Sequence, residues 1–385
     1  MQRWLFMVFC LGSVLFSATG LRAAEYTVTP ALTLQSTYDS NVYFKDAGDL
    51  ELRISPALEL DARTEKARVE ASAALDIWEY KRLNELDNTE QYYRLSTDLT
   101  PSEVWQTGVS GTYTDDYTFV STLEEVGVIA DPSRRKKSTV DPYLTFFTDT
   151  RNSLRGAYSF VKTNFELDRY PDYRVHGVNL TWSRALMNER SVFFCVAGAS
   201  DARYKQTAGD TEETTYRLVF GWEHAFSETL KGTVSAGPMY TDSDYYMGGT
   251  LVNEDTTDVF FDGTLEWNQE RITLSAHVDY DIDHSIYGEN ITRGRIRGTL
   301  GYRWTERFRG HFSTAFYSSE TDGLMRDEKR QTYWARPLVT YRLTDRIDLR
   351  AGYRYTWTEN RITDYSEERH RVGLQLAMDW PVLFD

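Results

Sequence analysis

Arginines recur at every second position near residue 295 of the chain. Arg293, Arg295 and Arg297 are each separated by one residue. Successive side chains of a β-strand point to opposite faces, so this spacing places the three guanidinium groups on one face. On neighbouring segments the same parity predicts a basic wall that consists of Arg293, Arg295, Arg297, Arg303, Arg309, Arg336, Arg350, Arg354 and Arg371.

Acidic residues follow the same alternation on the two preceding segments. They form a predicted acidic wall of Asp258, Asp262, Glu266, Asp279, Asp281 and Asp283. A basic wall beside an acidic wall produces an electric field that orients polar or charged solutes. Ion pairs between the two walls, which would fill the interior, are the alternative, and both arrangements can coexist.

Two other groups of residues could carry chemistry, and neither is convincing. His311 and Ser313 form a His-x-Ser pair on the predicted inner face, but no Asn or Asp follows at matching parity to orient the histidine. Asp279, Asp281 and Asp283 share a face that could bind calcium, but no glycine-containing calcium loop accompanies them. We therefore expect no enzyme activity, no metal and no cofactor.

Composition excludes several protein classes. Of the 385 residues, 14% are aromatic, which is too many for a disordered chain, and the charged residues leave a net charge of -15. That charge disfavours nucleic acid as a partner. Apolar runs of the length needed for a spanning helix are absent from the sequence. A large antiparallel β protein fits this composition.

The first 24 residues have the features of a secretory signal peptide. Arg3 supplies a basic start, residues 4–16 are apolar, and small residues precede a predicted cleavage after Ala24. Residues 25–385 then form one predicted domain. Its only cysteine is Cys195, so no disulfide can form within it.

Apolar and polar residues alternate over most of the mature chain, as in residues 347–357. Eighteen segments of this kind are predicted strands, and most are longer than the strands of soluble proteins. Short polar connectors alternate with longer charged ones. The segments are 26–42, 50–62, 66–80, 88–100, 105–119, 138–149, 153–166, 172–184, 190–205, 212–226, 229–243, 255–268, 270–284, 290–304, 307–320, 329–343, 346–360 and 366–380.

Long strands joined alternately by short turns and long loops are typical of an outer-membrane β-barrel. We therefore predict an all-β, antiparallel, up-and-down transmembrane barrel with 18 strands, 16 being the next choice. A β-solenoid or propeller is disfavoured because no fixed repeat is present. Tryptophans near strand ends fit the aromatic girdles of a barrel, at Trp105, Trp182, Trp267, Trp304, Trp357 and Trp380.

The last predicted strand carries a pattern that looks like the signal read by the barrel-assembly machinery. It places a polar residue, a glycine and two apolar residues at fixed intervals, followed by an aromatic residue. These residues are Arg371, Gly373, Leu376, Met378 and Trp380. The chain departs from the usual pattern because it ends in Asp385 rather than in an aromatic residue.

The chain also resembles the β-barrel porin-2 type of outer-membrane protein. Its most specific feature is the segment Tyr38, Asp39, Ser40, Asn41 and Val42, which looks like the start characteristic of that family. The resemblance implies a conduit in the outer membrane of a Gram-negative bacterium, often associated with exopolysaccharide export. It also implies a separate periplasmic polysaccharide export protein as a partner.

We therefore expect a porin-like conduit for a hydrophilic solute or polymer. Exopolysaccharide is the first predicted cargo, and small solutes or ions are the second. A surface adhesin or structural barrel with a closed lumen is the contrasting possibility. The expected partners are outer-membrane lipid, the barrel-assembly machinery and the cargo itself.

Overall fold

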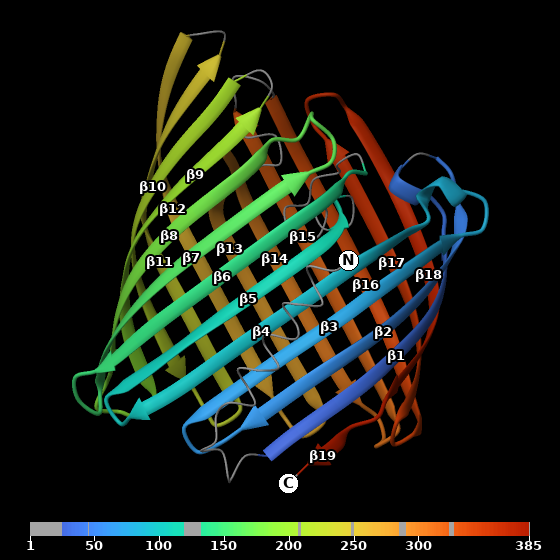
Figure 1. Ribbon diagram of the computed structural model, residues 1–385, viewed down its shortest axis with the longest axis horizontal. Coiled ribbons are helices and arrows are strands. Elements are labelled where there is room, and N and C mark those ends of the chain that lie inside the picture. The colour runs from blue at the N-terminus through green and yellow to red at the C-terminus, as the bar shows by residue number, and fades with distance from the viewer. Residues whose placement is uncertain are drawn as a thin grey trace, which may run out of the picture.

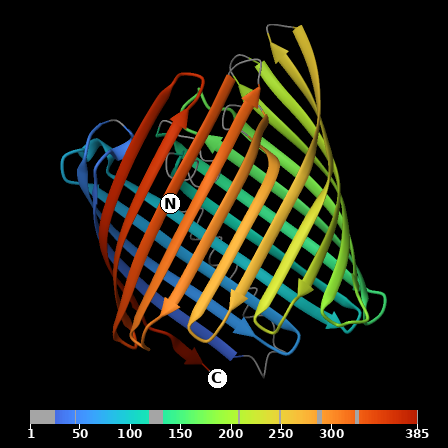
Figure 2. The ribbon, with the colours of Figure 1, turned by 180° about the vertical axis from the view of Figure 1, so that it is seen from behind.

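The chain forms one closed ring of antiparallel strands (Figures 1 and 2). This computed structural model describes residues 25–44, 46–118, 132–206, 209–247, 250–284, 290–322 and 327–384. The predicted signal peptide, residues 1–24, lies outside the described residues. The strands are β1 (Glu25–Asp39), β2 (Asp49–Arg63), β3 (Ala67–Tyr80), β4 (Asn88–Ser102), β5 (Trp105–Tyr117), β6 (Arg134–Phe147), β7 (Asn152–Phe165), β8 (Asp172–Ala185), β9 (Ser191–Gln206), β10 (Gly209–Ala225), β11 (Leu230–Met247), β12 (Thr250–Asn268), β13 (Ile272–His284), β14 (Asn290–Arg303), β15 (Phe308–Asp322), β16 (Asp327–Thr344), β17 (Ile347–Asn360), β18 (Tyr365–Asp379) and β19 (Val382–Phe384).

The prediction of an antiparallel barrel with 18 strands is confirmed, because every strand from β1 to β18 pairs with the next and β18 pairs back with β1. Two short 3-10 turns, η1 (Val42–Phe44) and η2 (Asn84–Leu86), lie between strands. No helix among the described residues is long and apolar enough to span a membrane.

The first and last strands of the ring meet at a seam, where β1 pairs with β18. This seam contains one element, β19, that the sequence did not predict. β18 pairs with β1 from Asp379 to Arg371, and the short β19 then continues in the same register opposite residues 26–28. Pro381 separates the two pieces because it has no N–H to donate to the sheet. Trp380 and Phe384 thus fall on the same face as the apolar residues of β18.

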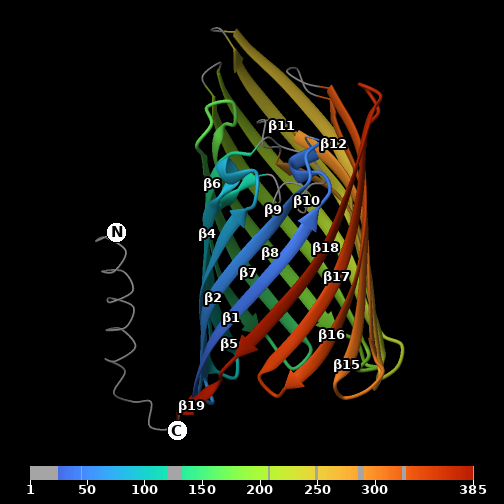
Figure 3. The same ribbon diagram turned by 90° about the vertical axis from the view of Figure 1, so that its right-hand side faces the viewer.

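The pairing registers decide which side chains point outward. Leu300 of β14 lies opposite Leu274 and Phe312, whereas Thr299 lies opposite Ser275 and Ser313. The outward face is apolar around the ring. The barrel wall is a single layer of sheet (Figure 3). Large apolar side chains that are exposed on this face include Leu52, Ile54, Val178, Leu180, Phe220, Leu300, Phe312, Val372 and Leu374.

One predicted connector belongs partly to a strand. The predicted strands 105–119 and 138–149 leave residues 120–137 as a long connector, but Arg134 to Lys137 form the first four residues of β6. Arg134 and Arg135 contact Asp115 and Asp116 of β5 at 2.6 and 2.8 Å. These ion pairs compensate the basic run and allow it to enter the sheet. Residues 120–131 of this predicted connector lie outside the described residues.

A short connector shows how the tight turns are stabilised. The Asp149 carboxylate accepts hydrogen bonds from the backbone N–H groups of Arg151 and Asn152, at 2.7 and 2.9 Å. The N–H of Arg151 and the Asn152 side chain favour the charged carboxylate, so the pKa of Asp149 is lowered. An aspartate at the first position of the turn thus replaces missing sheet hydrogen bonds.

We expect an arginine to be far more costly on the outer face than on the inner one. Leu300→Arg places a charge at mid-strand on the apolar face and should cost about 2–4 kcal/mol of folding free energy in lipid. Thr299→Arg, one residue away on the polar face, should cost little. Denaturant unfolding of both variants in lipid vesicles measures the difference. Equal costs would contradict the assignment of the two faces.

Candidate functional site in the lumen

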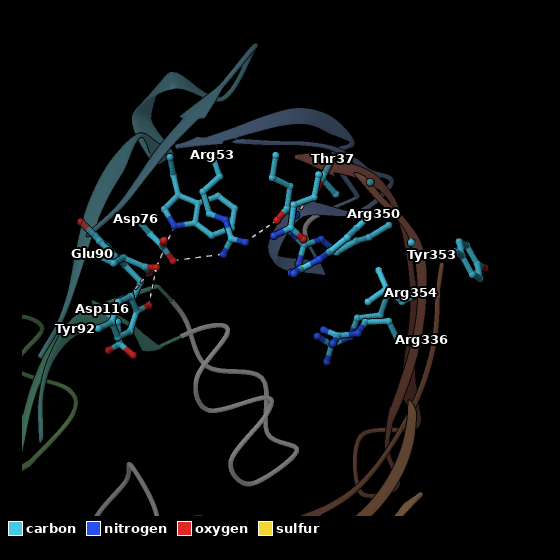
Figure 4. A pocket seen from close by; sticks show the side chains of 18 of the residues that line it. Thr37, Arg53, Asp76, Glu90, Tyr92, Asp116, Arg336, Arg350, Tyr353 and Arg354 are labelled. Atoms are coloured by element: carbon cyan, nitrogen blue, oxygen red, sulfur yellow. Dashed lines mark hydrogen bonds and ion pairs between the residues drawn. The ribbon is translucent and has the colours of Figure 1, made fainter. Parts of the chain in front are cut away.

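A cavity of about 640 Å³ lies inside the barrel between β1–β6 and β16–β18. Its lining residues come from two opposite walls of the lumen (Figure 4). Acidic and aromatic side chains line the wall formed by β3–β5. Arginines line the wall formed by β16–β18.

On the wall formed by β3–β5, which is not the acidic wall predicted from the sequence, the carboxylates are bound by other protein groups. Glu90 accepts hydrogen bonds from the Trp78 indole N–H at 3.0 Å and from the Tyr92 hydroxyl at 2.9 Å. Asp76 contacts the Arg53 guanidinium at 3.4 Å, and this guanidinium also lies 5.0 Å from the centre of the Trp78 ring. Asp76 is thus paired with a positive charge, whereas neutral donors hold Glu90, and the aromatic side chains of this wall face the cavity.

The third acidic residue that lines the cavity, Asp116, is also paired. Its partner is Arg135, and the side chains of both residues are at least 93% buried, at 7% and 5% exposure. Arg135 Nε and Nη2 each donate to one carboxylate oxygen, at 3.0 and 2.8 Å. This bidentate geometry fixes the rim of the acidic wall in place.

The wall formed by β16–β18 carries those arginines of the predicted basic wall that line the cavity. Arg336 of β16 and Arg350 and Arg354 of β17 point into the cavity, whereas Tyr353 lies on the outer side of the wall (Figure 4). The Arg336 side chain makes no ion pair or hydrogen bond with the described residues. Arg354 lies 4.9 Å from the centre of the Trp334 ring.

Arginines also face each other across the strands of this wall. Arg354 lies directly opposite Arg371 of β18. On its other side the register, with Ala335 opposite Tyr355, sets Arg336 across from Arg354. Like charges directly opposite each other destabilise a sheet, so this row is unfavourable in isolation.

The remaining residues of the predicted basic wall share the inner parity but have protein partners. Arg293 and Arg295 contact Asp279 at 3.5 and 2.7 Å. Arg309 and Arg350 both lie 3.6 Å from Asp348. Arg303 lies 4.0 Å from Glu270 in a turn, and Arg371 contacts Glu51 and Asp39. Arg297 is the exception: it lies opposite His277, and its side chain makes no ion pair with the described residues.

The predicted acidic wall of β12 and β13 is largely bound by its neighbours. Asp279 contacts His277 at 2.9 Å in addition to the two arginines of β14, and Asp262 lies 3.4 Å from the same histidine. Asp279 therefore follows the alternative arrangement, in which acidic and basic side chains of the lumen form ion pairs with each other. Asp258 accepts a hydrogen bond from Tyr280. Glu266 lies opposite Lys231 and Ser275, and Asp281 lies opposite Arg293. The side chain of Asp283 lies outside the described residues.

The acids that share the cavity with Arg336 and Arg354 come from β3–β5 instead. Sequence reasoning did not select Asp76, Glu90 and Asp116, although the parity of their segments was available. Asp76 and Glu90 face each other across β3 and β4. Only barrel closure brings these strands opposite β16 and β17.

His311 and Ser313 share the inner parity of β15, as predicted. They lie opposite Gly301 and Thr299 of β14, and no hydrogen bond joins them within the described residues. The described residues contain no group of three His, Cys, Asp or Glu side chains that could hold a metal ion.

The segment that resembles the porin-2 start lies at the seam of the barrel. The Asn41 side-chain amide donates to the Glu367 carboxylate at 2.9 Å and to the Glu368 carbonyl at 3.1 Å. The Ser40 N–H donates to the His370 carbonyl at 2.9 Å. This segment, which starts with the exposed Tyr38, therefore fastens the end of β1 to β18.

Asp39 of the same segment is the centre of a buried charge network. Its carboxylate accepts hydrogen bonds from Arg369 Nε at 2.8 and 3.0 Å and lies 3.4 Å from Arg371. Arg371 also contacts Glu51 of β2. Two carboxylates thus balance two guanidinium groups in a region where the Asp39 and Arg369 side chains are 0% and 6% exposed.

The last residue of this segment and the two residues after it turn onto the inner face. Val42, Tyr43 and Phe44 form η1 and are buried together with Tyr80. Trp78, which lines the cavity, packs against this cluster. The first loop therefore covers part of the lumen wall next to the cavity.

The predicted assembly pattern is divided between the two faces of β18. Arg371 and Gly373 face the lumen, opposite Arg354 and Gly352. The apolar members Leu376, Met378 and Trp380 fall on the outer parity. Recognition by the assembly machinery stays a prediction.

Comparisons with known proteins show the fold alone. No family model matches the chain, and no curated protein is similar to it. The copper transporter OprC is similar in structure at 10% identity and a TM-score of 0.50, with 88% of this chain and 64% of OprC covered. Acinetobacter baumannii OccAB3 has 10% identity and a TM-score of 0.48, and covers 94% of this chain and 100% of its own. Pseudomonas aeruginosa OccK2 in complex with glucuronate has 9% identity and a TM-score of 0.47, and covers 95% and 99%.

Proposed function

We propose that this protein is a porin-like conduit for hydrophilic solutes in the outer membrane of a Gram-negative bacterium. The observation that carries the proposal is the distribution of side chains on a closed ring. Leu52, Leu300 and Leu374 are exposed on the outside, whereas charged and polar groups line a cavity inside. Lipid covers such an outer face, and water or solute occupies such a lumen.

For the cargo, our first proposal is exopolysaccharide, in partnership with a periplasmic polysaccharide export protein. Its support is the resemblance to the porin-2 type of barrel, together with the tryptophan and tyrosine side chains of the acidic wall. A small-solute or ion porin is the second candidate. The inward position of the first loop beside a cavity of about 640 Å³ favours a small solute. An adhesin or structural barrel would instead keep its lumen closed.

Conductance and deletion experiments together test this function. We expect the purified protein to produce stepwise conductance in planar lipid bilayers, because a polar lumen admits hydrated ions. For an export conduit, deletion of the gene should abolish surface polysaccharide while polymer synthesis continues in the cell. Normal surface polysaccharide with conductance retained would establish the small-solute alternative. A silent bilayer with normal surface polysaccharide would contradict any conduit.

A further inference from the structure

The outer face of β6–β9 contains an apolar groove of about 770 Å³. Small residues line its floor, namely Gly156 of β7 and Ala197 and Ala199 of β9. Leu144 and Leu180 lie directly opposite Gly156 on the two neighbouring strands and are 48% and 50% exposed. A Cβ atom at Gly156 would meet no atom within 4 Å. The groove is therefore an open depression, bordered by leucines, on the apolar face of the barrel.

Two basic residues continue the same face beyond the groove. Lys162 of β7 and Arg174 of β8 lie directly opposite each other. Each is four residues from a groove residue of its own strand, Tyr158 or Val178, which is roughly 14 Å at about 3.4 Å per residue. Neither basic side chain makes an ion pair or a hydrogen bond with the described residues. Like charges directly opposite each other destabilise a sheet, so an anion bound between them would be stabilising.

Acidic residues of the neighbouring strands contact a different arginine. Asp201 contacts Arg203 at 3.1 Å, and Glu212 lies 3.8 Å from it. Arg203 itself lies opposite Arg174, so the row contains a third cation. Lys162 and Arg174 are therefore available to an anion from outside the protein.

Aromatic rings lie between the groove and this basic pair. Phe160 and His176 are cross-strand neighbours with ring centroids 5.0 Å apart. The Tyr158 hydroxyl forms a hydrogen bond of 2.7 Å with His176 Nδ1. Amphipathic rings are enriched where hydrocarbon meets headgroups. Groove, rings and cations thus follow the order of acyl chain, headgroup sugar and phosphate in a lipid.

We propose that this face binds a phosphorylated glycolipid of the outer leaflet, with an acyl chain over Gly156 and a phosphate on Lys162 and Arg174. Ammonium and guanidinium groups are strong donors to phosphate oxygens. The basic pair lies toward the end of the barrel that carries the longer connectors, such as residues 118–133 between β5 and β6. Longer connectors face outside the cell in such barrels, and the outer leaflet there consists of phosphorylated glycolipid. The inference rests on the proposed outer-membrane location and is independent of the solute in the lumen.

Native mass spectrometry of the folded protein in detergent, with purified diphosphoryl lipid A, tests the basic pair. The native protein should bind this lipid, and the K162Q/R174Q variant should bind it about tenfold or more weakly, because two phosphate contacts are lost. The matched control is R184Q/R190Q, which removes the same charge at the short-turn end of β8. Affinity should not change in this control.

A second pair of variants tests the groove. Gly156→Phe fills the open space above the floor and should weaken lipid A binding by about tenfold, because the acyl chain loses its apolar contact. Gly298→Phe is the control, since Gly298 lies between the outward Ile296 and Leu300 of β14, away from the groove. A Cβ atom at Gly298 meets only an ordinary contact of 3.6 Å with Thr314. This control should bind lipid A as the native protein does.

The outcomes separate this site from the conduit. Full binding in either test variant, or equal loss in its control, would overturn the site while leaving any measured conductance as support for the conduit. Phosphatidylglycerol bound as tightly as lipid A would overturn the assignment to a glycolipid. An oligomer that Gly156→Phe dissociates, with lipid binding unchanged, would show that a second copy covers the groove. Lipid A binding by a protein that never conducts would support the site and contradict the conduit. Heat-dependent mobility on gels checks that each variant is folded.

Discussion

Replacement of Asp39 by asparagine is expected to destabilise the barrel by about 3–5 kcal/mol, because it leaves a buried guanidinium without its carboxylate. The Asp39 side chain is 0% exposed and Arg369 is 6% exposed, so water cannot replace the lost charge. The pair also joins β1 to β18, and its loss weakens the seam that closes the ring. Guanidinium-induced unfolding in detergent, followed by tryptophan fluorescence, measures the change.

A surface ion pair provides the matched control for this change. Arg68 and Asp61 lie 3.0 Å apart, but their side chains are 45% and 36% exposed. Asp61→Asn should cost less than about 1 kcal/mol, since solvent screens such a pair. The double variant D39N/R369Q should recover part of the stability, because no unpaired charge is left buried. Equal effects of Asp39→Asn and Asp61→Asn would show that the seam network contributes little.

Charge reversal on the basic wall is expected to change the ion preference of the channel. Arg336→Glu together with Arg350→Glu should shift selectivity from anions toward cations by about tenfold, because fixed lumenal charge sets the local concentration of counter-ions. These two positions are chosen over Arg295, which contacts Asp279 at 2.7 Å. The Arg336 side chain has no ion pair among the described residues, and Arg350 shares Asp348 with Arg309, each at 3.6 Å. Reversal potentials measured across a KCl gradient report the preference.

Arg94→Glu tests whether position within the lumen matters. Arg94 faces the lumen from β4. Its replacement by glutamate changes the lumenal charge by half as much as the two reversals together. If selectivity depends on the basic wall, the shift per reversed charge should be clearly smaller at Arg94. An equal shift per charge would indicate that total lumenal charge, and not the wall, controls ion preference.

The seam network gives the porin-2-like segment a structural role. Asp39 anchors Arg369, and Asn41 binds Glu367 and the Glu368 carbonyl. These contacts join residues that are separated by more than 320 positions in the chain. The segment therefore contributes to barrel closure, independently of which solute passes through the lumen.

The sequence by itself determined the number of strands, their approximate bounds and the parity of their side chains. These properties are local: alternation with a period of two and the spacing of turn residues suffice to derive them. The inner parity of Arg336, Arg350 and Arg354 follows from residues within the same strands. So does the outer parity of Leu300, one residue from Thr299.

Only the tertiary structure decided which charges are balanced. Parity predicts that an arginine faces inward, but the register between strands decides that Arg295 meets Asp279 while Arg354 meets Arg371. Closure of the ring decides that the arginines of β16 and β17 share a cavity with Glu90 of β4, far away in sequence. The continuation of the seam beyond Pro381 likewise depends on pairing with β1. Register and closure arise from contacts between distant segments, and alternation within one strand carries no information about them.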